Sequence, residues 1–420
     1  MLSRRVFLKN GAFAFVSLGF APAFLTRTAF AGDRSGRSRR LIAIFQRGAV
    51  DGLNVVVPFG EAEYYKARPS IAIPRPTDAE NGALDLDGFF GFNPRLKALK
   101  PLWDAKRLAV VHACGSPDST RSHFDAQDYM ETGTPGLKST ADGWLNRYLQ
   151  AKREEAAAHE KNPFRAVSLT QQLPRTLQGA APAVAMNQIA QFGVRAGQRS
   201  DEASALFEAA YGAAPDRILA GTGREAFDAM KMLKTADPAQ YQPANGASYP
   251  GSPFGQALRQ IAQLTKANVG LEVAFADVGG WDTHVNQGAS QGQLATRLND
   301  FGQAIAALAT DLGDALDDTV ILTMSEFGRA VSENGNRGTD HGHGNAMMAI
   351  GGRVRGGRVY GRWPGLAVEQ RYDRRDLAVT TDFRDVFGEI LVRHLGLSDT
   401  HGIFPGYNTQ TTKFPGLFAA

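Results

Sequence analysis

Five short, uninterrupted apolar runs constrain the fold of this chain more than any other feature of its sequence. A strand that is buried on both faces has this form, because neither face needs polar side chains. The runs span residues 41–45, 108–112, 271–276, 319–323 and 346–350. Segments with a helical pattern separate several of them, at residues 124–131, 203–233, 294–312 and 383–395. This alternation predicts an α/β fold, in which helices cover both faces of a mostly parallel central sheet.

The chain is long enough for this sheet to form one large domain. Its 420 residues, 43% of them hydrophobic and 21% charged, are typical of a globular protein with a sizeable core. Residues 150–260 differ from the rest, because they are rich in alanine and glutamine and contain loops with proline and glycine. We expect a single domain over residues 32–420, with a largely helical insertion or cap at about residues 150–260.

The first 31 residues carry the pattern of an export signal. The sequence SRRVFLK at residues 3–9 is a twin-arginine motif, an apolar stretch follows at residues 11–25, and AFA at residues 29–31 matches a signal-peptidase site. The apolar stretch is shorter than the ~20 residues that span a bilayer, so no stable membrane span is expected. The pattern predicts a signal peptide at residues 1–31, export by the twin-arginine machinery, and a periplasmic or secreted mature protein.

Charge and cysteine content narrow the function further. Removal of residues 1–31 takes away four basic residues and no acid, which leaves 42 residues of each sign. The mature chain then has no basic excess with which to bind nucleic acid. Cys114 is the only cysteine in the sequence, so an internal disulfide is excluded.

Polar segments flanked by glycine follow four of the apolar runs and precede the fifth. In parallel sheets ligands bind beyond the carboxyl ends of the strands, so these segments are candidates for a common site. They are QRGAVDGLN at residues 46–54, SPDSTRS at 116–122, DVGGWDTH at 277–284, SEFGR at 325–329 and GTDHGHG at 338–344. Carboxylates and neutral imidazoles bind zinc or manganese, and carboxylates with water also suit magnesium or calcium. The segments predict one or two divalent metal ions and metal-assisted hydrolysis with a hydroxyl nucleophile.

Several of these segments together resemble the domain-of-unknown-function 1501 family. The resemblance rests on FQRGAVDGLN, RSHFDAQDYMETGTPG, DVGGWDTHVNQG, SEFGR and GTDHGHGNAMMAIGG, behind a twin-arginine signal, and it covers about residues 40–410. That family is grouped with the alkaline phosphatase-like superfamily, which includes phosphatases, sulfatases and cofactor-independent phosphoglycerate mutases. The resemblance implies an alkaline phosphatase-like fold and a hydrolase of phosphate or sulfate esters.

The resemblance also implies metal ligands in the first and third segments. Asp51 falls at the superfamily's first-strand metal aspartate. Asp277 and Asp282 reproduce a spacing seen in phosphatases, where an acid ends a strand and a metal-binding aspartate follows five positions later. The superfamily histidine often comes four residues after that aspartate, whereas His284 comes after two. Turn chemistry is the alternative role for these aspartates, since the side chain of Asp readily bonds its own backbone.

Two further ligands are implied in the last two segments. Glu326 stands in SEFG, which resembles the superfamily's Ser-Asp-His-Gly, but Phe327 replaces the histidine. One metal ion then lacks a nitrogen ligand unless His343 or His112 supplies it. His341 falls at the superfamily's last histidine, and we expect His343 beside it to bind metal or to act on the transferring oxyanion.

Ser122 falls where the superfamily nucleophile opens a helix, and Thr120 is its rival. A structural role for Ser122 is also open, since Ser-x-x-Asp ending at Asp125 is close to a helix-capping box. The two roles are compatible, because a helix N-terminus also favours a bound anion.

Two functions remain open on the sequence. The first is an exported metal-dependent hydrolase that acts on an anionic ester, either a small molecule or linked to a glycan. The formylglycine route of sulfatases is disfavoured, because CGSP at residues 114–117 does not fit the required C/S-x-P-x-R pattern. The alternative is a non-catalytic envelope protein that keeps the fold and binds a partner or glycan. Phe327 in place of a ligand histidine favours this alternative. For Glu326 itself, an ion pair with Arg329 is the alternative to a role in the site.

Overall fold

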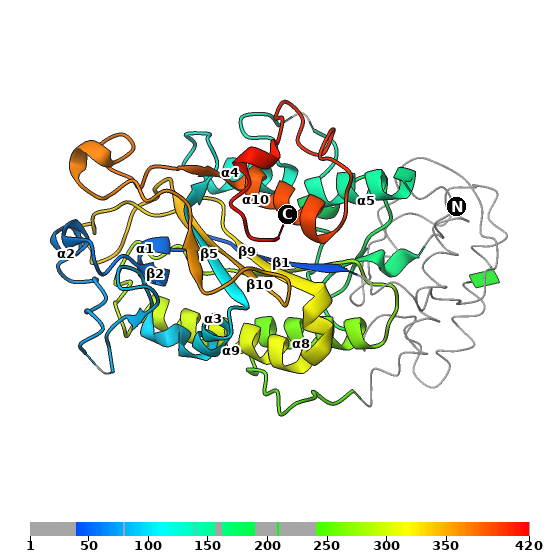
Figure 1. Ribbon diagram of the computed structural model, residues 1–420, viewed down its shortest axis with the longest axis horizontal. Coiled ribbons are helices and arrows are strands. Elements are labelled where there is room, and N and C mark those ends of the chain that lie inside the picture. The colour runs from blue at the N-terminus through cyan, green and yellow to red at the C-terminus, as the bar shows by residue number, and fades with distance from the viewer. Residues whose placement is uncertain are drawn as a thin grey trace, which may run out of the picture.

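A nine-stranded sheet forms the core of the protein (Figure 1). The computed structural model describes residues 39–78, 80–138, 140–155, 162–189, 208–209 and 241–419. The strands of the sheet are β1 (Arg40–Gln46), β5 (Leu108–Gly115), β6 (Ala166–Ser168), β7 (Val184–Ala185), β8 (Val273–Val278), β9 (Thr319–Met324), β10 (Asn345–Ile350), β11 (Arg358–Tyr360) and β12 (Thr381–Asp382). The five predicted apolar runs form β1, β5, β8, β9 and β10, so the predicted sheet is confirmed.

In the central sheet, β1 is an interior strand and β10 runs in the opposite direction to its neighbours. The order is β11-β5-β10-β9-β1-β8-β6-β7, and β12 also pairs with β5. β1 runs parallel to β8 and β9, whereas β10 runs antiparallel to both β5 and β9. Asn345, the first residue of β10, pairs with Cys114 near the end of β5. The chain before β10 therefore reaches the same edge of the sheet as the chain after the parallel strands.

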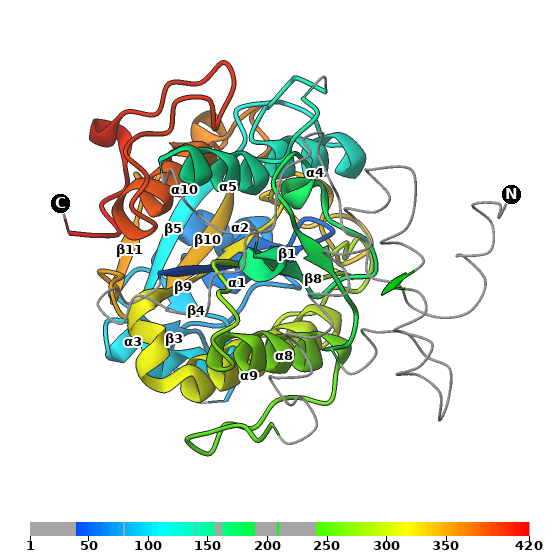
Figure 2. The ribbon, with the colours of Figure 1, turned by 90° about the vertical axis from the view of Figure 1, so that its right-hand side faces the viewer.

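Helices cover both faces of the sheet, as predicted. In Figures 1 and 2, α4, α5 and α10 lie on one face, and α3, α8 and α9 lie on the other. The helices are α1 (Gly52–Val55), α2 (Ala62–Ala67), α3 (Lys100–Asp104), α4 (His123–Thr132), α5 (Trp144–Glu155), α8 (Pro253–Lys266), α9 (Gln293–Leu312) and α10 (Phe383–Glu389), and a π-helical turn (Ile390–His394) follows α10. None of the helices in the described part of the chain is long and apolar enough to cross a membrane.

Alternation along β1 divides the hydrophobic core into two layers. Ile42 and Ile44 belong to the layer that contains residues of α8 and α9. Leu41, Ala43 and Phe45 belong to the layer that contains residues of α5 and α10. Successive side chains of a strand point to opposite faces, so a strand covered on both sides needs an apolar residue at every position. This requirement explains the uninterrupted apolar run at residues 41–45.

The described parts of residues 150–260 belong to the main fold. β6 and β7 extend the sheet beyond β8, and α8 covers one of its faces. The rest of the predicted insertion, including nearly all of the helical pattern at residues 203–233, lies outside the described residues, as does the predicted signal at residues 1–31. A second, three-stranded sheet contains β2 (Val56–Val57), β3 (Leu84–Asp85) and β4 (Gly91–Phe92).

Candidate metal centre

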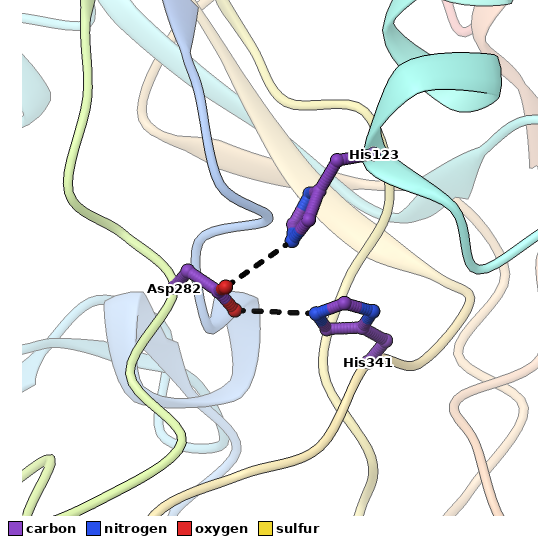
Figure 3. A group of neighbouring side chains, drawn as sticks. All are labelled: His123, Asp282 and His341. Atoms are coloured by element: carbon purple, nitrogen blue, oxygen red, sulfur yellow. Dashed lines mark hydrogen bonds and ion pairs between the residues drawn. The ribbon is translucent and has the colours of Figure 1, made fainter.

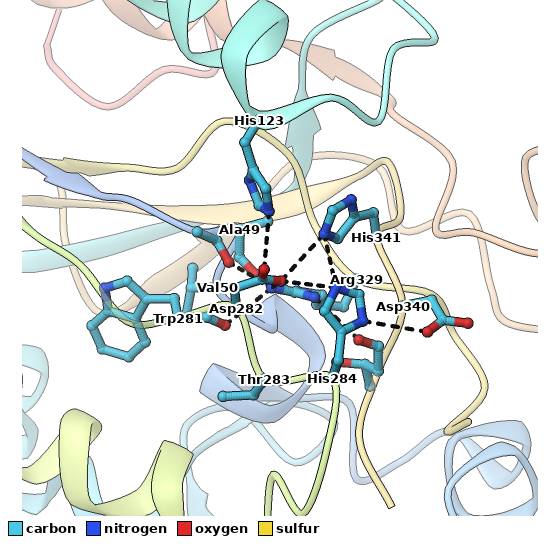
Figure 4. Close-up of polar contacts among 12 residues, drawn as sticks. Ala49, Val50, His123, Trp281, Asp282, Thr283, His284, Arg329, Asp340 and His341 are labelled. Carbon is cyan, nitrogen blue, oxygen red and sulfur yellow. Dashed lines mark hydrogen bonds and ion pairs between the residues drawn. The ribbon is translucent and has the colours of Figure 1, made fainter. Parts of the chain in front are cut away.

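Two histidines and one aspartate from distant parts of the sequence, His123, His341 and Asp282, meet at the edge of the sheet where the parallel strands end (Figure 3), and a third histidine, His284, lies beside them (Figure 4). Asp282 lies at their centre. Its Oδ1 is 3.0 Å from Nε2 of His284 and 3.2 Å from Nε2 of His341, and its Oδ2 is 3.4 Å from Nε2 of His123. We call these four residues the histidine cluster. Its members are between 23% and 42% exposed, so a ligand in solvent can reach them.

Each imidazole of the histidine cluster has its Nδ1 occupied by an acceptor. Nδ1 of His123 lies 2.8 Å from Oε1 of Glu326, and Nδ1 of His341 lies 2.8 Å from the carbonyl oxygen of Arg121. Nδ1 of His284 lies 3.4 Å from Oδ1 of Asp340 (Figure 4). An Nδ1 that donates to an oxygen leaves Nε2 with its lone pair, which is the arrangement found in metal-bound histidines.

The Nε2 atoms of His284 and His341 lie only 3.0 Å apart. Two nitrogen lone pairs at this distance repel each other unless a positive centre, a proton or a metal ion, lies against them. In a tetrahedral zinc site with bonds of ~2.0 Å, neighbouring ligand atoms are about 3.3 Å apart. The separations of 3.0 to 3.4 Å around Asp282 are close to that value. His123, Asp282 and His341 also offer ligand atoms that all lie within 4.8 Å of one another, so these three residues could hold a divalent metal ion.

The topology of the sheet determines where the residues of the histidine cluster lie. His123 is the first residue of α4, which follows β5. Asp282 and His284 come after β8, and His341 comes shortly before β10. Because β10 is antiparallel, its beginning lies at the same edge as the ends of β5 and β8. The four residues of the histidine cluster thus come from three segments that meet at one edge of the sheet.

Two glycines let the backbone approach Asp282 closely. Gly280 has a φ of +87°, in the left-handed region that favours glycine, and it turns the chain after β8. Gly48 has a φ of +111°, and a Cβ on it would lie 2.9 Å from the amide nitrogen of Asp282. Trp281 anchors the turn, since its ring is buried and its Nε1 donates to the carbonyl of Val278 at 2.8 Å. The glycines after β1 and β8 therefore serve close packing around the carboxylate.

Arg329 places a buried positive charge against Asp282 (Figure 4). Its Nη2 donates to Oδ1 of Asp282 at 2.6 Å, and its guanidinium also donates to the carbonyls of Gly48, Ala49 and Trp281. Burial alone would raise the pKa of Asp282, but the hydrogen bond and charge of Arg329 outweigh burial and lower it. The carboxylate is therefore held ionised and in a fixed orientation.

Opposite effects act on two of the imidazoles. The hydrogen bond to Glu326 raises the pKa of His123, because the carboxylate stabilises the imidazolium. Burial lowers the pKa of His341, since it disfavours the charged form of the ring. The two rings lie edge to face with centroids 4.3 Å apart, so they cannot both carry a charge without repulsion.

The family model described as "Protein of unknown function (DUF1501)" matches residues 107–403, a span that contains the whole histidine cluster. The chain belongs to the DUF1501 family. A comparison with curated proteins gives no match.

Several solved structures share a general similarity with this DUF1501 protein. The PsFucS1 sulfatase from Pseudoalteromonas sp. is 11% identical, with a TM-score of 0.40 over 92% of this chain and 73% of that chain. The C-terminal periplasmic domain of EcEptC from Escherichia coli, in complex with Zn, is 11% identical, with a TM-score of 0.38 over 90% of each chain. The phosphonate monoester hydrolase SpPMH from Silicibacter pomeroyi is 10% identical, with a TM-score of 0.40 over 91% of this chain and 77% of that chain. Similarities this low establish no activity for the DUF1501 protein.

Of the metal ligands predicted from the sequence, Asp282, His284 and His341 come together directly. Glu326 is not among them but lies behind His123. Its side chain is fully buried, and its Oε1 accepts hydrogen bonds from His123, from Nε2 of Gln127 at 2.9 Å and from the amide of Gly48 at 2.8 Å. Its position is that of a carboxylate which orients a histidine ligand.

Asp51 lies in a different environment, as part of a buried ion pair. Its Oδ2 is 2.6 Å from Nη1 of Arg68 and 2.6 Å from Nε2 of Gln287, and both side chains of the ion pair are 0% exposed. Arg68 also donates to the carbonyls of Ala330 and Val331. A guanidinium and an amide thus occupy this carboxylate, and no histidine of the cluster contacts it in the described contacts.

Asp277 also faces an arginine. Its Oδ2 is 2.5 Å from Nε of Arg47, whose Nη1 contacts Glu131 at 2.8 Å. This acid near the end of β8 therefore lies against the chain that follows β1.

Ser122 is the N-cap residue of α4, but its side chain makes no capping hydrogen bond. Its amide nitrogen contacts Oγ1 of Thr120 at 3.2 Å, so Thr120 closes a local turn before the helix. The capping role considered for the Ser122 hydroxyl is thus not seen, and Ser122 directly precedes His123 of the histidine cluster.

His343 and His112, which the sequence offered as replacements for the missing histidine ligand, do not join the cluster. His343 is buried and stacks on Tyr372, with ring centroids 4.2 Å apart. His112 is also buried; its Nε2 bonds the carbonyl of Val56 at 2.9 Å and its Nδ1 accepts from the amide of Ala113 at 2.9 Å. Both nitrogens of His112 are therefore occupied by backbone, and this residue has no lone pair for a metal ion.

His123 is the residue of the cluster that the sequence analysis missed. The available signal was its place in RSHF directly after the candidate nucleophile, in a chain with only 8 histidines. Phe327, which stands where a ligand histidine was expected, instead stacks on the His123 ring with centroids 5.1 Å apart. Phe327 thus takes the position of the expected histidine after β9, and an imidazole from the start of α4 joins the cluster instead.

Proposed function

We propose that this protein is a hydrolase of phosphate or sulfate esters that depends on one divalent metal ion held by the histidine cluster. The observation that supports the proposal is the convergence of three Nε2 atoms on Asp282, each imidazole with its Nδ1 on an acceptor. The pattern at residues 1–31 further favours action outside the cytoplasm, since a twin-arginine signal directs export.

The donor set favours zinc or manganese over magnesium or calcium. Three imidazoles and one carboxylate suit the former, whereas the latter prefer oxygen ligands. A single ion is favoured because Asp51, Asp277 and Glu326 already contact arginine, amide or imidazole groups. When bound, such an ion polarises an ester oxygen and lowers the pKa of bound water.

The chain's own residues would orient the ester and supply the nucleophile. Glu326 fixes the ring of His123, and Arg329 fixes the carboxylate of Asp282. Both side chains are therefore held in place before the metal ion or the ester binds. Ser122 begins α4 with a hydroxyl that is not used for capping, where the partial positive charge of the helix start favours an approaching anion. We assign the attacking hydroxyl to Ser122, with Thr120 as the alternative because its Oγ1 lies beside the Ser122 amide.

The first experiment measures the metal content of the mature protein, residues 32–420, and of Asp282→Asn and His341→Ala. A structural zinc site contributes roughly 10–16 kcal/mol, so each of four ligands accounts for about 3 kcal/mol. We expect both substitutions to weaken metal binding by about 100-fold or more. A wild-type protein without metal, or variants that retain it, would contradict the metal proposal.

The second experiment measures hydrolysis of 4-nitrophenyl phosphate and 4-nitrophenyl sulfate. Ser122→Ala is expected to abolish turnover and leave the metal content unchanged, and Thr120→Ala tests the alternative nucleophile. A metal-loaded protein that hydrolyses neither ester under any condition would favour the other function left open by the sequence, a non-catalytic envelope protein. In that case the ion pair of Arg329 with Asp282 would serve to stabilise the fold.

A further inference from the structure

A polar pocket lies at the ends of three neighbouring parallel strands. Its volume is about 530 Å³, within the range of ~300–1,000 Å³ typical of small-molecule sites. It is lined by Arg47 after β1, by Asp277 near the end of β8, and by the loop after β6, which contributes Thr170, Gln171, Gln172 and Arg175 among others. The order β1-β8-β6 places these three segments side by side.

The pocket is connected to the histidine cluster by two hydrogen bonds. Nη1 of Arg47 lies 3.0 Å from Oε1 of Gln127, and Nε2 of Gln127 lies 2.9 Å from Oε1 of Glu326, the carboxylate behind His123. Arg47 also precedes Gly48, the residue that packs against the backbone of Asp282. Gln127 lies four residues after His123 on α4, so the Arg47 wall of the pocket is about one helical turn from the cluster.

The charges that line the pocket are already balanced. Arg47 contacts both Asp277 and Glu131, at 2.5 and 2.8 Å. Nε of Arg175 contacts Asp128 at 3.1 Å. Paired guanidinium and carboxylate groups keep further hydrogen-bonding positions but offer no net charge to a second anionic group. The pocket is therefore suited to a neutral, polar ligand.

The glutamines of the loop after β6 provide free donors and acceptors. Gln171 and Gln172 are exposed, and no hydrogen bond to their side-chain amides is found among the described residues. An amide offers one acceptor oxygen and two donor hydrogens, which match hydroxyl groups that both donate and accept. The hydroxyl of Thr170 lies beside them, bonded to Ser168 at 2.9 Å.

We propose that this pocket binds the saccharide part of the substrate, so that the reacting ester is carried by a sugar. The inference rests on the proposed function for the ester, but the sugar-binding pocket is a separate property of the chain. A saccharide is neutral, rich in hydroxyl groups and small enough for the pocket, whereas an aryl or alkyl group would leave the amides of Gln171 and Gln172 without partners.

The test compares the wild-type, metal-loaded protein with the double variant Gln171→Ala/Gln172→Ala. The probes are glucose 6-phosphate and galactose 6-sulfate, with 4-nitrophenyl phosphate and sulfate as esters that lack a sugar. We expect the ratio of kcat/KM for sugar ester over aryl ester to fall about tenfold in the double variant, as for the loss of two hydrogen bonds. Gln303→Ala, which removes an exposed glutamine on α9, is the matched control and should leave the ratio unchanged.

Calorimetric titration of the same proteins with the sugar esters separates this inference from the proposed function. Sugar binding that weakens about tenfold in the double variant supports the pocket, even if no ester is hydrolysed. Hydrolysis of aryl esters without reaction or binding of the sugar esters would overturn the pocket and leave the hydrolase proposal standing. An equal loss on sugar and aryl esters, or no loss on either, would also overturn it.

Discussion

Asp282 and Asp51 are two aspartates that the sequence assigns to one metal site, yet the structure surrounds them differently. Three imidazoles lie within 3.4 Å of the carboxylate of Asp282, which is 42% exposed. Asp51 is 0% exposed and contacts Arg68 and Gln287. An arginine, Arg329, also contacts Asp282, but the carboxylate of Asp282 still contacts three imidazoles. At Asp51 the buried Oδ1 is the carboxylate oxygen that has no hydrogen-bond partner.

The difference shows that the partners of a carboxylate decide its role more than its place in a motif. A buried aspartate needs a partner of opposite charge in the folded protein, and a guanidinium provides one because it is always charged. A half-exposed aspartate that faces neutral imidazoles remains able to accept a cation from solvent. The comparison therefore separates a carboxylate that holds the fold together from one that can bind metal.

The largest effect is expected from breaking the buried ion pair of Asp51. Arg68→Met removes the guanidinium and leaves a buried charge alone, which typically costs about 3–5 kcal/mol in the free energy of unfolding. Chemical denaturation with chelator present measures this loss. Metal affinity of the remaining folded protein should stay close to wild type, because the ion pair does not contact the histidine cluster in the described contacts.

Asp51→Asn is the matched control for this prediction. It removes the negative charge but keeps the shape and one acceptor, so a loss of stability without a loss of metal is again expected. If Asp51→Asn abolishes metal binding in a protein that is still folded, Asp51 is a ligand and the comparison with Asp282 is wrong.

The second effect concerns a buried histidine, His112, which contrasts with the half-exposed histidines of the cluster as Asp51 contrasts with Asp282. His112 is buried with both nitrogens bonded to backbone, and burial lowers its pKa to about 4. Its unfolded pKa is about 6.5, so the unfolded chain takes up a proton first as the pH falls between these values. Stability is therefore unaffected above pH ~6.5 and decreases by roughly 3 kcal/mol as the pH falls toward ~4.

Denaturation curves of the metal-free protein across this pH range measure the effect of His112. His112→Gln should have a smaller loss of stability between neutral and acidic pH than wild type, whatever its absolute stability. His401, which is exposed, provides the control substitution His401→Gln. Equal slopes for wild type and His112→Gln would mean that His112 titrates normally.

The third effect tests whether Glu326 acts through His123. Glu326→Gln keeps the side-chain shape but weakens the acceptor for Nδ1 of His123, and outer carboxylates of this kind typically contribute 10- to 100-fold to metal affinity. Competition with a chromophoric chelator measures the affinity. Glu333→Gln, a carboxylate that bonds Ser70 and Ile71 in another loop, is the control and should leave the affinity unchanged.

Much of the fold could be predicted from the sequence, because burial on both faces forces runs such as residues 41–45 to be apolar throughout. The direction of β10 could not, since an apolar run has no direction. That direction matters for the site: only an antiparallel β10 brings His341 to the edge reached by Asp282. The resemblance indicated the segments correctly, but not which side chains meet.

The partners of the acids were beyond the sequence for a physical reason. The partners in the pairs Arg68–Asp51, Arg329–Asp282 and Arg47–Asp277 are 17, 47 and 230 residues apart, and nothing local in the sequence marks one arginine as the partner of one acid. His123 is different, because it stands beside Ser122 in a segment already identified as part of the site. A histidine next to a candidate nucleophile should therefore be considered as a candidate ligand in the same way as the residues that follow the strands.

The smallest effect is expected at Asp277, the third aspartate of the predicted metal site. Its ion pair with Arg47 is 25% and 31% exposed, so solvent screens it and it contributes only about 0–1 kcal/mol to stability. Asp277→Asn should therefore barely change the unfolding curve, and metal affinity should remain within error of wild type, in contrast to Asp282→Asn. A large loss of metal from Asp277→Asn would extend the metal site toward β1 and show that exposure alone does not distinguish a ligand from a neighbour.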